Sequence, residues 1–141
     1  MNDLSIYQEK ILNLANENKK SIAIEDFNRS FAVKNPMCGD EVKVRLKLID
    51  KHITDISAIV RGCALCEASA GLVVKLFKNS DIPNKQLTED FENWLNNIDQ
   101  PIPATLPKEM DVFKPIKEIK NRHKCITMPF EATVKSVQND N

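Results

Sequence analysis

The sequence predicts an α+β fold, in which a small three-stranded antiparallel sheet carries helices packed on one face. Three observations support it: an amphipathic N-terminal segment, strict alternation over residues 41–48, and helix-period segments after Gly62. The 141 residues suit a single domain covering 1–141, and 42% hydrophobic with 28% charged residues is ordinary globular composition. We therefore expect one domain with a real core.

The N-terminal half predicts one helix followed by the strands. Residues 3–19 place apolar side chains 3.6 residues apart, which is typical of a helix with one buried face. Residues 41–48 (EVKVRLKL) alternate between apolar and charged, which indicates a half-buried strand. Residues 50–51 suit a turn into a second strand over 52–60, and a third strand is expected within 21–33.

The C-terminal half predicts helices. Residues 64–78 keep helical spacing, and 80–84 are expected to be a loop. Thr88 is a candidate N-cap for a short helix over 88–97, with Phe91 and Trp94 in the core. The other expected elements are an extended proline-rich connector over 99–107, a helical segment over 110–120 interrupted near Pro115, and a final helix over 130–137 with Pro129 in its first turn.

Charge and hydropathy argue against several classes of protein. Twenty Lys and Arg balance twenty Asp and Glu, which is unusual for a dedicated nucleic-acid binder. No apolar stretch reaches the ~18 residues that a membrane span needs, and the charged N-terminus lacks the features of a signal peptide. We expect a cytoplasmic protein without nucleic-acid or membrane partners.

The chain has four cysteines. The cytoplasm expected for it is a reducing compartment, which disfavours structural disulfides. Cys38 lies in a turn-like segment, Asn35-Pro36-Met37-Cys38-Gly39-Asp40. Cys63 falls at a strand-to-helix junction, where the helix dipole favours a thiolate, and Cys125 follows Arg122-His123-Lys124. The alternative to metal or thiol chemistry is that these residues are small buried hydrophobes.

Taken together, Cys38, Asp40, Cys63 and Cys125 supply three thiolates and one carboxylate. Such a set is sufficient for tetrahedral zinc, and three thiolates with one further ligand can also hold an iron–sulfur cluster. The separations of 25 and 62 residues between the cysteines exclude a zinc finger, which brings its ligands in close pairs. The fold itself must therefore assemble the site.

The order PMCGD, strand hairpin, RGCAxxxAS and RxKC resembles the IscU/NifU-like iron–sulfur cluster assembly family over nearly the whole chain. It looks most like the SufU branch, because Lys124 stands where the housekeeping IscU scaffolds have histidine. The long segment between the second and third cysteines, with an insertion expected within 84–118, is also similar to SufU.

The resemblance implies a function and its residues. It implies that Cys38, Asp40, Cys63 and Cys125 hold Zn²⁺, and that Cys38 accepts persulfide sulfur from a pyridoxal-phosphate cysteine desulfurase. The protein would then be a sulfurtransferase-like accessory of that enzyme. The alternative is an IscU-type scaffold in which the same residues assemble a transient [2Fe–2S] cluster, delivered to apo iron–sulfur proteins or a downstream scaffold.

Four further residues are candidate accessories: Cys66, Arg122, His123 and Lys124. Cys66 departs from the family pattern and forms a C-x-x-C with Cys63, so it is either a buried helix residue, an alternative ligand or a resolving thiol in a redox module. His123 is either a solvated neighbour or a substitute for Asp40. Arg122 and Lys124 either form an ordinary charged surface, or stabilise the thiolate of Cys125, or bind the desulfurase. A purely structural zinc domain is the remaining alternative.

Overall fold

The computed structural model describes residues 3–37 and 39–138 and has the expected α+β architecture. Four antiparallel strands form one sheet in the order β1-β2-β3-β4. The strands are β1 (Arg29–Lys34), β2 (Glu41–Ile49), β3 (His52–Arg61) and β4 (Ser80–Asp81). The helices are α1 (Asp3–Lys20), α2 (Ala64–Phe77), α3 (Leu87–Leu95) and α4 (His123–Gln138), with 3₁₀ helices η1 (Lys108–Glu118) and η2 (Lys120–Arg122) before α4.

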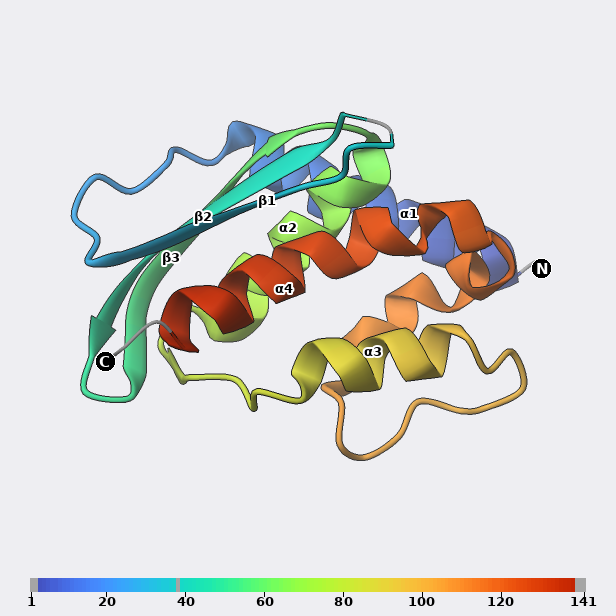
Figure 1. The fold of residues 1–141 in the computed structure, drawn as a ribbon. Helices are drawn as coiled ribbons and strands as arrows, with labels where there is room; N and C mark the ends of the chain where they lie inside the picture. The colour runs from blue at the N-terminus through green and yellow to red at the C-terminus, as the bar shows by residue number, and fades with distance from the viewer. Residues whose placement is uncertain (1–2, 38, 139–141) are drawn as a thin grey trace.

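The helices cover one face of the sheet (Figure 1). Helix α4 contacts β1 and β2, α2 contacts β3, and α1 lies along α2. The alternation in β2 has the predicted consequence: Val42, Val44 and Leu46 are fully buried toward the helices, while the charged residues between them face the other side. The sheet face and the helices therefore enclose the core.

One strand prediction is confirmed with a small change of its bounds, and one loop prediction needs correction. The third predicted strand is β1, confined to the end of the 21–33 interval and extended to Lys34. The segment 80–84, expected to be a loop, contains β4, which pairs with the first residues of β3. A two-residue strand is too short to give a sequence signal, and its pairing depends on the turn at Asn79, whose φ is 60°.

Two helix boundaries were also predicted wrongly. Thr88 is not the N-cap of α3, because the helix begins at Leu87 and the Asn84 side chain accepts a hydrogen bond from the Gln86 backbone N–H instead (2.8 Å). The final helix begins at His123 rather than at residue 130, and Pro129 lies inside it. Residues 125–130 are all buried, so tertiary packing outweighs the loss of one helical hydrogen bond at the proline.

A buried lysine anchors the segment that leads back to α4. Lys117 is 2% exposed, and its ammonium donates to the backbone carbonyls of Asn97 (2.8 Å) and Gln100 (2.6 Å) while lying over the Trp94 ring. Burial lowers the pKa of Lys117. These contacts tie the loop after α3 to η1 and so fix where the chain enters α4.

Candidate metal centre

The loop between β1 and β2 is closed around Asn35. Its backbone N–H donates to the Asp40 carbonyl (2.8 Å), its carbonyl accepts from Gly39 (2.8 Å), and its side-chain oxygen accepts from the Met37 N–H (3.1 Å). Gly39 has a φ of +78°, a left-handed conformation that glycine adopts without strain. This tight turn places the Asp40 side chain, which is 8% exposed, at the end of the sheet.

Cys63 lies at the strand-to-helix junction, as predicted. It is the N-cap of α2 in an extended conformation, and its side chain makes no capping hydrogen bond. Gly62, just before it, lies against Asp40: a Cβ at this position would be 2.7 Å from the Asp40 Cγ. The missing side chain at Gly62 therefore lets the carboxylate approach the end of α2.

Cys125 enters the same place from the first turn of α4. Its thiol is 1% exposed and donates to Asp40 Oδ2 at 3.5 Å. One ligand atom from each of Asp40, Cys63 and Cys125 lies within 4.8 Å of the other two. Three segments that are far apart in the sequence thus converge at one end of the molecule.

The arrangement suits a thiophilic cation. Ligand atoms ~2.0–2.3 Å from a tetrahedral zinc ion are roughly 3.3–3.8 Å apart, so a small contraction of this cluster would give its three ligand atoms the spacing of a tetrahedral site. Burial, followed by hydrogen bonding to Cys63, raises the pKa of Cys125 to about 12. The thiol is therefore protonated at neutral pH without a cation, and metal binding must release that proton.

Cys38, predicted as the fourth ligand and the sulfur carrier, lies outside the described residues. Cys66 is fully buried in α2 and does not belong to the three-residue cluster, although it lies within electrostatic reach of Cys63, Asp40 and Cys125. Burial raises the pKa of the Cys66 thiol. The interpretation of Cys66 as a buried helix residue agrees with this placement.

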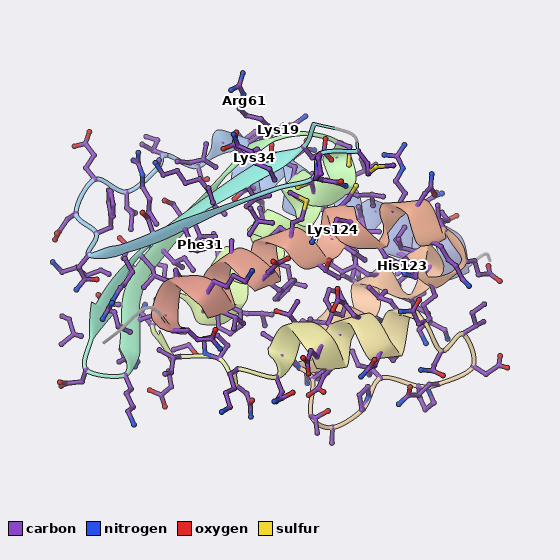
Figure 2. The ribbon with its side chains drawn as sticks, viewed as in Figure 1. Lys19, Phe31, Lys34, Arg61, His123 and Lys124 are labelled. Atoms are coloured by element: carbon purple, nitrogen blue, oxygen red, sulfur yellow. The ribbon has the colours of Figure 1, made fainter. Side chains whose placement is uncertain are left out.

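The three residues before Cys125 have different surroundings. The Arg122 guanidinium is exposed, and its interactions with Cys125 and then with Cys63 raise the pKa of Arg122. The His123 Nε2 lies 3.0 Å from the carbonyls of Ile116 and Lys117, at the end of η1 (Figure 2). Lys124 pairs with Glu131 at 3.0 Å. Of the three, Arg122 is the residue whose pKa responds to Cys125, Cys63 and Asp40.

Two positions that sequence reasoning did not single out also shape the centre. Asn35 closes the loop before Asp40, and its Asn-Pro signal is too common to identify such a role. Asn18 of α1 is 7% exposed and donates to the Glu67 carboxylate and to the Ala58 carbonyl. This contact joins α1 to the first turn of α2, directly after Cys63. No pattern along the sequence predicts it.

We predict that Gly62→Ala weakens metal binding while leaving the fold intact. The new Cβ would lie 2.7 Å from the Asp40 Cγ, and the Asp40 side chain must move away to admit it. We expect roughly a tenfold or greater loss of zinc affinity in a competition titration, comparable to the loss of a supporting contact in other zinc sites. In the matched control, Gly39→Asn, the added Cβ has no atom within 4 Å outside its chain neighbours, and asparagine tolerates a positive φ. This variant should therefore bind zinc more tightly than Gly62→Ala. Equal affinities for both variants would contradict this account of Gly62.

Comparisons with known proteins identify the family to which the chain is similar. Residues 6–126 match the family described as the NifU-like N-terminal domain. The zinc-dependent sulfurtransferase SufU of Bacillus subtilis is 24% identical over 106 residues, covering 74% of this chain and 71% of that protein. The iron–sulfur cluster assembly scaffold protein IscU of Thermotoga maritima is 34% identical over 70 residues, so the match spans about half of each chain.

Solved structures agree on the fold. The N-terminal NifU-like protein of Brucella abortus has a TM-score of 0.70 at 22% identity, with 94% of this chain and 92% of that one covered. A SUF-system scaffold protein described as putative, from Fervidobacterium islandicum, has a TM-score of 0.71 at 23% identity, with coverage of 92% and 94%. Because the family match covers most of the chain, this protein belongs to the NifU-like N-terminal domain family of iron–sulfur cluster assembly proteins.

Proposed function

We propose that this protein is a zinc-dependent sulfur acceptor that takes persulfide sulfur from a cysteine desulfurase. Cys38 carries the sulfur, and Asp40, Cys63 and Cys125 are the remaining metal ligands. The observation that carries the proposal is the convergence of these three ligand atoms, within 4.8 Å of one another, at one end of the sheet. The similarity to a zinc-dependent sulfurtransferase supports zinc as the resident metal.

Each residue of the site would have a separate role in such a centre. Bound zinc would supply a positive charge that keeps thiolates deprotonated at neutral pH. Asp40 and Cys125, both buried, hold one side of the centre, and the half-buried Cys63 presents its thiol from the helix N-terminus. The exposed Arg122 guanidinium, which interacts with Cys125 and Cys63, offsets part of the negative charge of three thiolates and one carboxylate.

The sulfur transfer itself is a thiol exchange. The Cys38 thiolate attacks the outer sulfur of the desulfurase persulfide, forms a new S–S bond and displaces the enzyme cysteine as a thiolate. No external oxidant or reductant is needed, because the outer sulfur keeps its oxidation state as it changes partners. The desulfurase regains its free cysteine and can release sulfur from another substrate molecule.

The test is a kinetic one. A cysteine desulfurase from the same source is mixed with cysteine, a mild reductant and increasing amounts of this protein, and alanine release is followed. We expect strong stimulation by the zinc-loaded wild type and none by Cys38→Ser. Cys66→Ser is the matched control and should stimulate as wild type does. Lack of stimulation by wild type, or equal stimulation by Cys38→Ser, would contradict the proposal.

A scaffold function is the second candidate, and the 34% identity to the Thermotoga maritima IscU favours it. In that case the same ligand set assembles a transient [2Fe–2S] cluster, with Asp40 as the oxygen ligand that keeps it transferable. Anaerobic reconstitution with iron and sulfide separates the two candidates. A [2Fe–2S] spectrum that passes to an apo-ferredoxin, without stimulation of alanine release, would favour the scaffold.

A further inference from the structure

The face of the sheet that points away from the helices ends beside the metal centre in a cluster of cations. Lys34 of β1 and Arg61 of β3 both pair with Glu41 of β2, so all three side chains point to the same face. Lys43 lies two residues further along β2 on that face and pairs with Ile59. Lys19, near the end of α1, lines a hollow together with Ile59 and Val60.

We call Lys19, Lys34, Lys43 and Arg61 the basic sheet end. Two strand spacings separate Lys34 from Arg61, which is roughly 10 Å, and Lys43 is about 7 Å from Glu41 along β2. Figure 2 shows Lys19, Lys34 and Arg61 gathered at the end of the sheet that carries the sulfur atoms. Arg61 immediately precedes Gly62 and Cys63, and β1 ends at Lys34 directly before the Asp40 loop, so this surface borders the centre.

Like most Lys and Arg side chains of the described residues, these four cations take part in no ion pair. In the part of the chain that the structure describes, ion pairs join Lys47 to Asp26, Lys78 to Asp55, and Glu131 to Lys124 and Lys135. None of those pairs involves the basic sheet end. Its acidic neighbours are Glu41, between Lys34 and Arg61, and Glu67, which binds Asn18 and lines the same hollow as Lys19.

The surface therefore holds four exposed cations against two half-buried carboxylates, in a chain whose formal net charge is zero. Apolar side chains accompany them: Ile59 is 37% exposed between Lys43 and Arg61, and Met37 on the adjoining loop is 91% exposed. Unpaired cations around exposed apolar side chains are the composition of a protein-docking surface, where charge steers association and apolar contacts hold the complex.

We propose that the basic sheet end docks the sulfur-donating desulfurase through an acidic surface of that enzyme. This inference rests on the proposed function. Docking here places the partner directly beside the loop that carries Cys38 and Asp40 in sequence, which is the position that sulfur delivery requires.

The test reverses charge on this surface and on a matched one. Lys34→Glu with Arg61→Glu is compared with Lys51→Glu plus Lys85→Glu, two exposed lysines away from the centre, so that net charge changes equally. Alanine release is measured against the concentration of this protein at low and moderate salt, with zinc content as a second readout.

The proposal predicts a rise of at least about fivefold in the half-saturating concentration for Lys34→Glu/Arg61→Glu, with an unchanged maximum rate and zinc content. The control should behave as wild type, and added salt should narrow the difference between the two variants. Half-saturating concentrations that match for both variants would overturn the docking surface while leaving the sulfur acceptor function standing.

Two other outcomes would also overturn the inference. If the cations only balance the negative charge of the centre, zinc content falls and the half-saturating concentration stays the same. If the surface pairs two copies of this chain, light scattering shows a dimer that Lys34→Glu/Arg61→Glu dissociates. Failure of the wild type to stimulate at any concentration would instead contradict the proposed function itself.

Discussion

Cys125→Ala is expected to abolish stable zinc binding, with a loss of affinity of about a hundredfold or more. Contacts that merely support a zinc ligand contribute 10–100-fold in other sites, so removal of a ligand sets at least the upper end of that range. Cys125 is 1% exposed, and its sulfur is one of the three converging ligand atoms. Metal analysis of the purified protein, followed by competition with a chromogenic chelator, measures the effect.

Cys66→Ala provides the matched control for that experiment. Cys66 is another buried thiol on a helix, and it lies outside the three-residue cluster. Its replacement should cost some stability through the small cavity left behind but should leave zinc content unchanged. Circular dichroism verifies that both variants fold. If the two variants lose zinc alike, the assignment of the cluster as the metal site is wrong.

Gly71→Ala is expected to destabilise the protein by about 1–3 kcal/mol, although helix propensity alone favours alanine by about 1 kcal/mol. Gly71 lies in the middle of α2 where α1 packs against it, and a Cβ there would be 2.5 Å from the Leu14 carbonyl oxygen. The two helices must move apart to admit the methyl group. Urea unfolding monitored by the Trp94 fluorescence gives the free energy of unfolding.

A change on the exposed side of the same helix distinguishes packing from propensity. Lys75→Ala, at an exposed position of α2, should stay within about 0.5 kcal/mol of wild type. Because α1 also contacts the first turn of α2 through Asn18 and Glu67, Gly71→Ala should weaken zinc binding slightly as well. A Gly71→Ala protein more stable than wild type would show that the close helix contact is not a constraint.

The predictable parts of this fold are those with a local signal. The alternation of β2 and the helical period of α2 depend on neighbouring residues, so the hairpin and the following helix could be predicted closely. The start of α4 could not be predicted. Pro129 suggests that a helix begins there, but burial of residues 125–130 stabilises a helix that begins earlier. Strand β4 depends wholly on its pairing with β3.

The candidate metal centre likewise has features that the sequence predicts and features that it does not. Cys63 could be placed at the N-terminus of a helix from the strand-to-helix change around Gly62, and the side chains of Asp40, Cys63 and Cys125 do meet. What the sequence could not reveal is how they are brought together. Gly62 matters because Asp40 fills the space of its missing side chain, and Gly71 matters because the backbone of α1 lies against it. These are contacts between segments, and a pattern along one segment does not contain them.

The central claim is that Cys38 accepts sulfur beside a metal centre formed by Asp40, Cys63 and Cys125. The most direct measurement is the intact mass of the zinc-loaded protein after brief incubation with a cysteine desulfurase and cysteine, followed by peptide mapping under non-reducing conditions. We predict one added sulfur atom, located on Cys38 and removed by a reductant. Added sulfur on Cys66 instead, or no added sulfur while the desulfurase turns over, would contradict the claim.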